Sequence, residues 1–245
     1  MGKKIPLKID DTIAYSILEI RFDLSINHKF LIGKIMPVLI KDFPTFEPIN
    51  QEIPPVLREQ HARFKFIPEF RFSNDQFLIA IGKNVIQFEF MREYKSWHEF
   101  GDCIRCNLKK IFGLGVIKSI LRIGLRYSNI IKEESIKNVV DLNFDLPFQL
   151  ESNLETINVN KRFEFASDEL KVNLVFATNA QIDRKLVNYQ VRGLLIDVDI
   201  FKDHDLLNEL DSTLELIEAL HEKEKFVFFN SLKQKFIDSR NPRYE

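Results

Sequence analysis

The stretch IAYSILEIRFDL, residues 13–24, sets the fold class, because its apolar and polar residues alternate almost one by one. In an extended strand, successive side chains point to opposite faces of the sheet. Leu18, Ile20 and Phe22 therefore share one face, while the charged residues between them lie on the other. This pattern predicts a β-strand that is buried on one face only.

Working outward, similar patterns predict further strands at 63–73, 77–81, 85–91, 116–131, 155–166, 170–178 and 188–201. Helical periodicity appears at 27–42, at 96–112 and across 203–239. Strands followed by C-terminal helices, without regular strand–helix alternation, are typical of antiparallel sheets. We expect an α+β fold with two mainly antiparallel sheet layers, covering helices and a helical C-terminus.

The same elements suggest a division of the chain. Residues 1–131 form an N-terminal half with strand, helix, three strands, helix and strand, and residues 132–154 form a connection. Residues 155–245 form a C-terminal half with three strands followed by helices. The polar run HEKEK, residues 221–225, lacks apolar residues on the helix seam, so the last helical region is expected to divide there.

Composition points to a cytoplasmic protein without membrane contact. No apolar run approaches the roughly 20 residues that span a bilayer, and the first residues, MGKKIPLKIDD, lack the apolar region of a secretory signal. Two cysteines are too few for a disulfide scaffold. They form a CxxC within a predicted helix, and no second Cys or His pair completes a zinc site.

Charge is divided unevenly along the chain. Residues 1–131 carry 20 Lys and Arg against 14 Asp and Glu, a net of +6, whereas residues 132–245 carry 15 against 22, a net of −7. Either the halves attract each other, or the first half offers a basic face to an anionic partner such as a nucleic acid. The basic residues are interleaved with acids and form no aromatic–basic stripe, so nucleic-acid binding is not favoured.

The strand RIGLRYSN, residues 122–129, is the strongest candidate for a binding site. Arg122 and Arg126 share one face with Gly124 between them, at a spacing of about 7 Å. Two guanidiniums beside a glycine suit a carboxylate or phosphate ligand. Alternatively, the arginines form cross-strand ion pairs with Glu19 or Glu89, which are common in sheets, and this is our expectation.

Other residues are weaker candidates for a site. Tyr127 and Asn129 complete the arginine strand as ligand-binding candidates, and His221 faces either the core or a pocket. Asp197, Asp199 and Asp203 could supply oxygen ligands to Mg²⁺, but the stretch lacks the glycine of a calcium loop. Asp203 or Asp205 is more simply the N-cap of the next helix. We therefore expect no metal and no cofactor.

Five stretches together resemble a family. They are AYSILEIRF (14–22), YKSWHEF (94–100), LRIGLRYSN (121–129), LLIDVDIF (194–201) and ALHEKEKFVFFNSLKQKF (219–236). In this order they resemble a sporadically distributed family of uncharacterised bacterial and archaeal proteins, marked by a Gly-Leu-Arg-Tyr-x-Asn strand and a Leu-His before a Phe-rich helix. Where that family commonly has Thr-Asp near the C-terminus, this chain has Leu232 and Lys233. The resemblance implies an accessory gene, a class that includes defence and toxin–antitoxin cassettes.

These observations lead to three functional hypotheses. The sequence lacks the common phosphate-binding, dinucleotide, metalloprotease and esterase motifs. We therefore expect a non-enzymatic interaction protein that binds a protein partner or forms a homo-oligomer. The alternative is a small-ligand or nucleotide-sensing or catalytic domain with an arginine-lined pocket, and the second alternative is nucleic-acid binding through the basic half.

Overall fold

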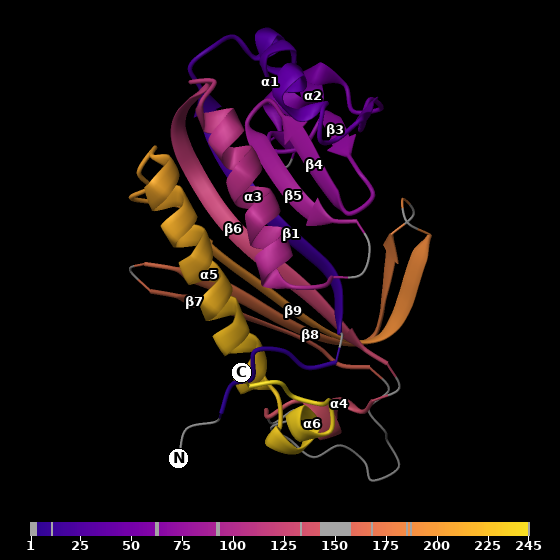
Figure 1. The fold of residues 1–245 in the computed structure, drawn as a ribbon. Coiled ribbons are helices and arrows are strands. Elements are labelled where there is room, and N and C mark those ends of the chain that lie inside the picture. Colours follow the sequence, from indigo (N-terminus) through magenta and orange to yellow (C-terminus); the bar gives the residue numbers. More distant parts are fainter. Residues whose placement is uncertain are drawn as a thin grey trace. The chain divides into compact units, whose positions relative to one another are not determined.

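A computed structural model describes residues 4–10, 12–61, 64–91, 94–132, 134–142, 158–167, 169–184, 186 and 188–244. Within these residues, nine strands join into one hydrogen-bonded sheet in the order β2-β3-β4-β5-β1-β6-β9-β8-β7 (Figure 1). The strands are β1 (Ile13–Leu24), β2 (Thr45–Pro48), β3 (Phe70–Ser73), β4 (Phe77–Gly82), β5 (Val85–Phe90), β6 (Ile117–Ile131), β7 (Asn160–Ala166), β8 (Lys171–Arg184) and β9 (Tyr189–Lys202). The sheet is antiparallel, as the sequence predicted.

Helices follow or interrupt the strands, and the chain ends in helices as predicted. They are α1 (Leu31–Leu39) with the short 3-10 helix η1 (His28–Phe30) before it, α2 (Pro55–Gln60), α3 (Trp97–Phe112), α4 (Ile136–Val139), α5 (Leu210–Ser231) and α6 (Gln234–Asp238). In the described part of the chain, no helix combines the length and apolar character that a membrane crossing requires.

The chain divides by packing into two compact units, each made of separate stretches. Unit 1 consists of Met1–Ala14, Arg126–Ile200 and His221–Glu245, and unit 2 consists of Tyr15–Leu125 and Phe201–Leu220. Four long elements, β1, β6, β9 and α5, therefore contribute residues to both units.

Unit 2 is built on the strand pattern that opens the sequence. Leu18 and Ile20 of β1 are fully buried and lie opposite Phe88 and Ile86 of β5. Helix α3 covers this region, because the ring of Phe100 packs against Phe77 of β4 and Phe90 of β5. The strands expected within 13–24, 63–91 and 116–131 do join in one sheet, although the first part of 63–73 is not a strand, and α3 lies on that sheet (Figure 1).

Helix α3 begins and ends where its sequence predicts. Ser96 is the N-cap, and its hydroxyl accepts a hydrogen bond from the Glu99 backbone N–H at 3.2 Å. Gly113 is the C-cap, and Gly115 follows in the left-handed region with a φ of 63°.

Unit 1 contains the β7–β8 hairpin, the final residues of β6, most of β9 and the second half of α5. Its core includes Leu174 and Phe176 of β8, with Ile196 and Val198 of β9. The chain near α4 is tied to the end of α5 by a bridge between Val140 and Leu232.

Several details differ from the expectations or lie outside the described residues. The strands form one sheet, not clearly two layers, since β1, β6 and β9 run through both units. The strand expected at 63–73 begins only at Phe70, after Pro68, which lacks a backbone donor. Most of the connection expected at 132–154, including its apolar stretch FDLPF at 144–148, lies outside the described residues.

The C-terminal helical region also differs from its prediction. Helix α5 runs unbroken through residues 221–225, because Leu220, Glu224 and Phe228 continue one buried stripe across the polar run. Asp203 and Asp205 do not cap it, since the helix begins only at Leu210.

Candidate functional site

A polar cluster on β6 and β9 of unit 1 joins the exposed Arg126 to the buried Ser128 and Asp197. The Nε of Arg126 donates to both carboxylate oxygens of Asp197, at 2.8 and 3.1 Å. The hydroxyl of Ser128 donates to the same carboxylate at 2.6 Å. Arg126 and Ser128 are two residues apart and so share one face of β6. The buried Asp197 side chain is thus hydrogen-bonded by two donor groups, the Arg126 guanidinium and the Ser128 hydroxyl.

Glu224 of α5 adds a second buried acid to unit 1. It is 6% exposed, and none of the other described residues forms a hydrogen bond or ion pair with it. Burial, with a smaller contribution from the nearby Asp197 carboxylate, raises the pKa of Glu224 from 4.5 to about 8. At neutral pH this side chain is therefore mainly a neutral acid, able to take up or release a proton.

His221 lies one turn before Glu224 on the same helix. Its ring centre is 6.3 Å from that of Tyr127, which is buried on β6. Burial, with a smaller effect from Lys225, lowers the pKa of His221 from 6.5 to about 4. The imidazole is thus neutral at physiological pH.

Asn129 is also buried in unit 1. Its side-chain oxygen accepts a hydrogen bond from the Thr12 hydroxyl at 2.8 Å, which ties the N-terminal segment to β6. Four of the five predicted ligand-binding candidates, Arg126, Tyr127, Asn129 and His221, therefore belong to unit 1.

Arg122 belongs instead to unit 2, where it contacts Glu19 and Phe201 of the same unit. Its Nη1 donates to Glu19 Oε1 at 3.0 Å, and its guanidinium lies over the Phe201 ring. A Cβ atom on Gly124 would collide with this guanidinium, so the glycine leaves room for the Arg122 side chain. Glu19 also accepts hydrogen bonds from Arg21 and Gln87. The expected pairing with Glu19 is present, but Arg122 makes it, whereas Arg126 binds Asp197.

The aspartates proposed as metal ligands do not gather. Asp199 contacts Asn173 at 3.4 Å, and Asp203 contacts the ring of His204 at 3.2 Å. Asp197 is occupied by Arg126 and Ser128. Across the described residues, no group of three His, Cys, Asp or Glu side chains is placed to hold a metal ion.

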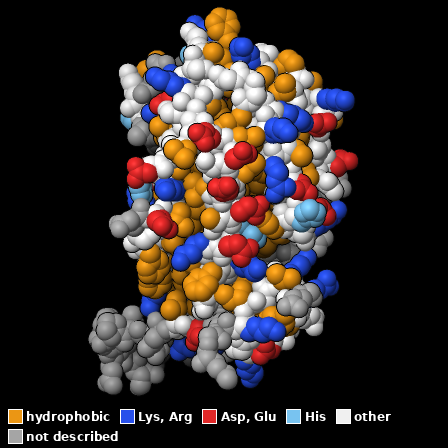
Figure 2. Space-filling model, turned by 60° about the vertical axis from the view of Figure 1, so that its left-hand side comes forward, with side chains coloured by type: hydrophobic (Ala, Val, Ile, Leu, Met, Phe, Trp, Pro, Cys, Tyr) orange, Lys and Arg blue, Asp and Glu red, His pale blue; other side chains and the backbone are white. Residues whose placement is uncertain are grey.

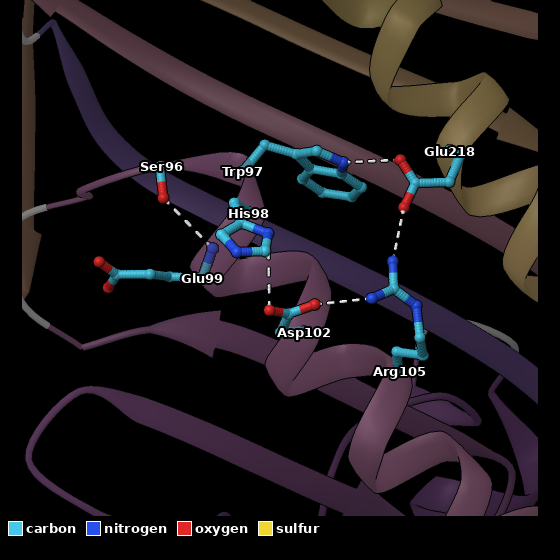
Figure 3. Close-up of polar contacts among 7 residues, drawn as sticks. All are labelled: Ser96, Trp97, His98, Glu99, Asp102, Arg105 and Glu218. Carbon is cyan, nitrogen blue, oxygen red and sulfur yellow. Dashed lines mark hydrogen bonds and ion pairs between the residues drawn. The ribbon is translucent and has the colours of Figure 1, made fainter.

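A second polar network in unit 2 joins α3 to the first half of α5 (Figure 3). Glu218 of α5 accepts hydrogen bonds from the Trp97 indole at 2.7 Å and from Arg105 at 3.3 Å. Arg105 also pairs with Asp102 at 2.6 Å, and His98 lies 3.5 Å from the same carboxylate. The His98 side chain is 86% exposed, and the Asp102 and Glu218 carboxylates already pair with Arg105. We therefore interpret this network as a link between two helices and not as a catalytic site.

A cavity of about 460 Å³ opens beside this network in unit 2. Its walls include Glu99, Asp102, Cys103 and Cys106 of α3. Burial raises the pKa of the Cys103 thiol to about 12, which leaves almost no thiolate for nucleophilic chemistry. Cys103 is therefore not an activated nucleophile in this cavity.

The two edge strands of the sheet, β2 and β7, differ in their suitability for pairing with an added strand. Strand β2 has only four residues and ends at Pro48, and both features block strand addition. Strand β7 has seven residues and no proline, and within the described chain its one strand neighbour is β8. Phe165 on β7 is 54% exposed. An exposed edge strand with an apolar side chain is a template for pairing with another chain.

Sequence reasoning missed Glu224, Ser128 and the availability of β7. Glu224 carries a signal, because it lies midway between Leu220 and Phe228 on the apolar seam of the helix. The edge position of β7 depends on strand order, which local patterns do not specify. Comparisons with protein-family models and with curated proteins find no match to this chain.

Proposed function

We propose that this chain is a protein-interaction protein whose contact element is the edge strand β7. The observation that carries the proposal is the contrast between the two sheet edges: β2 is short and closed by Pro48, whereas β7 is longer and proline-free. Native proteins usually protect edge strands against pairing. Among the described residues, no second strand or proline closes the β7 edge, which is consistent with its use as a binding surface.

The side chains of β7 favour a protein partner. Along the strand, Lys161, Arg162 and Glu164 alternate in part with Phe163 and Phe165. Backbone hydrogen bonds would give affinity to an added strand, and the exposed Phe165 would supply apolar contact. Such pairing needs no catalytic group, consistent with the missing enzyme motifs. We propose that the chain acts in the cytoplasm, and its family resemblance suggests a role in an accessory system such as defence or a toxin–antitoxin pair.

A ligand-sensing or catalytic function is the second candidate, because Glu224 and His221 have strongly displaced pKa values on one helix. However, an anionic ligand would have to compete with Asp197 and Glu19 for the two arginines. Arg126 pairs with Asp197, and Arg122 pairs with Glu19. The arginine strand therefore favours a structural role.

Nucleic-acid binding is less well supported. The arginines Arg21, Arg71 and Arg105 of the basic half each pair with an acid. Acidic side chains gather in a central column in Figure 2, with Lys and Arg side chains beside it. Among the described residues, that face shows no continuous basic surface of the kind that binds phosphates.

Site-specific photo-crosslinking tests the proposed function. Phe165 is replaced by p-benzoylphenylalanine in the full chain, and Phe226 of α5, 50% exposed, is the matched control. After irradiation in cells, adducts are identified by mass spectrometry. We expect protein adducts from position 165 and few from position 226. No adduct at 165, or equal yields at both positions, would contradict a role for β7.

A further inference from the structure

We propose that the partner of β7 is β7 of a second copy of this chain, paired antiparallel about a two-fold axis at Phe163. This inference rests on the proposed function and names its partner. It follows from the direction of the backbone groups, from the order of charges along the strand and from the contrast with β2.

The hydrogen bonds to β8 determine which backbone groups of β7 are available. The carbonyl of Val159 accepts from Thr178 N–H at 2.9 Å, and Ser167 N–H donates to Leu170 at 2.9 Å. Residues 159 and 167 therefore direct their backbone groups toward β8. Because these directions alternate along a strand, the odd-numbered residues between them also face β8. Residues 160, 162, 164 and 166 direct their N–H and C=O groups outward.

An added antiparallel strand must pair outward-facing residues with outward-facing residues. In a symmetric pair of β7 strands, even-numbered residues must then lie opposite even-numbered residues. The two-fold axis must therefore pass through a residue and not between two residues. An axis at Phe163 places Arg162 opposite Glu164 of the second copy, and Glu164 opposite its Arg162. It also aligns all seven residues of the strand, Asn160 with Ala166 at the ends.

The neighbouring registers place like charges opposite each other. An axis at Arg162 places two arginines opposite each other, an axis at Glu164 does the same with two glutamates, and an axis at Lys161 opposes two lysines. Like charges directly opposite destabilise a sheet, whereas opposite charges stabilise it. Within the strand Asn160–Ala166, only the Phe163 axis places opposite charges across from each other, and for that reason we select it.

The charged residues of β7 are exposed. The side chains of Arg162 and Glu164 are 59% and 66% exposed, and they form an ion pair with a 2.8 Å separation within one strand. Two copies would bring four alternating charges together on one face of the extended sheet. Electrostatic complementarity of this kind sets register and partner choice.

The other face of β7 carries the apolar residues. Phe163 and Phe165 lie opposite Leu174 and Val172 of β8, which are buried, and the Phe163 ring packs edge-on against Phe176 at 6.3 Å. A Phe163 axis brings the two Phe163 rings together across the axis. It also places Lys161 opposite Phe165, where a cation can contact the aromatic face. Pairing would thus cover the exposed Phe165.

Sedimentation of the full chain over a range of concentrations tests the inference. The monomer mass is 28.9 kDa, and we expect a dimer of twice that mass with a dissociation constant of about 1–100 μM, as for a small interface. Arg162→Glu and Glu164→Arg each oppose like charges, so each should weaken dimerisation about tenfold or more.

Charge exchange provides the specific control. The double variant Arg162→Glu/Glu164→Arg restores opposite charges and should dimerise like the wild type. A mixture of the two single variants should form a heterodimer although neither variant dimerises well alone. Glu215→Arg, a reversal on the exposed side of α5, should leave the dimer unchanged.

Glu164→Pro supplies a second variant, since its N–H faces outward and is not used by β8. It should give a monomer with nearly unchanged melting temperature. A wild type that stays monomeric at all concentrations, or a dimer insensitive to both reversals, would overturn the inference. If the dimer fails either test, crosslinks from position 165 to a different protein would still support β7 as an interaction strand. If no crosslink forms at position 165 either, the proposed function is contradicted as well.

Discussion

Arg126 and Asp197 form an ion pair in which only the arginine meets solvent: its side chain is 49% exposed, whereas that of Asp197 is 7% exposed. A buried carboxylate that loses its cation remains in a medium of low dielectric constant. The arginine therefore has a structural consequence whether or not it also meets a ligand.

Arg126→Ala should lower the free energy of unfolding by about 1–3 kcal/mol, because Asp197 loses a charge-assisted partner and keeps the Ser128 hydrogen bond. Adding Asp197→Asn should recover part of the loss. Urea denaturation of the single and double variants measures both effects. Arg192→Ala, at an exposed position on β9, is the matched control and should change stability by less than about 0.5 kcal/mol. An unchanged stability for Arg126→Ala would instead favour a binding role.

Two glycines should respond in opposite directions to alanine. A Cβ atom on Gly193 would collide with the Ile131 carbonyl of β6, so Gly193→Ala should destabilise the chain by about 1–3 kcal/mol. Gly33 in α1 has open space around its Cβ position, so Gly33→Ala should stabilise it by about 0.5–1 kcal/mol. Thermal unfolding reports both, and equal effects would contradict the close approach at Gly193.

The pH dependence of stability follows from Glu224 and His221. The folded pKa of Glu224, about 8, lies above its ordinary value of 4.5, so the folded chain holds a proton that the unfolded chain has released between those values. Stability from this group falls as pH rises through that window. The folded pKa of His221, about 4, lies below its ordinary 6.5, so its contribution rises with pH between about 4 and 6.5. The two trends oppose each other until pH 6.5, above which only Glu224 remains.

Glu224→Gln should remove the part of the free energy of unfolding that decreases as pH rises. The free energy of unfolding of this variant, relative to wild type, should increase by about 1.4 kcal/mol per pH unit between pH 4.5 and about 8. Urea denaturation at several pH values measures the difference, with Glu222→Gln on the exposed side of α5 as the control. A pH-independent difference would show that Glu224 ionises normally in the folded chain.

The two cysteines should differ in reactivity. Cys106 is exposed, whereas burial raises the pKa of Cys103 to about 12. Because the thiolate is the nucleophile, iodoacetamide near pH 8 should modify Cys106 in the folded chain and reach Cys103 only after unfolding. Mass spectrometry of the alkylated chain gives the order, and equal rates would contradict the raised pKa of Cys103.

The sequence specified local elements better than their arrangement. Alternation along β1 and helical spacing along α3 depend on neighbouring residues, so both elements were predicted, β1 together with its buried face. The partner of Arg126 was missed, because β9 lies beside β6 in the sheet although it is remote in sequence. Glu224 was passed over because a polar run usually marks a solvated face, yet here one acid of the run is buried. Strand order, which makes β7 an edge, depends on pairings that no local pattern contains.

Amide hydrogen exchange in β7 tests the central claim most directly. The N–H groups of Phe163 and Phe165 face β8 and should exchange slowly at every protein concentration. Those of Arg162 and Glu164 face outward and should exchange rapidly in dilute solution. Pairing of two β7 strands predicts that the Arg162 and Glu164 amides become protected as concentration rises, and that Glu164→Pro abolishes the protection at Arg162. Rapid exchange of both amides in the wild type at all concentrations would contradict it.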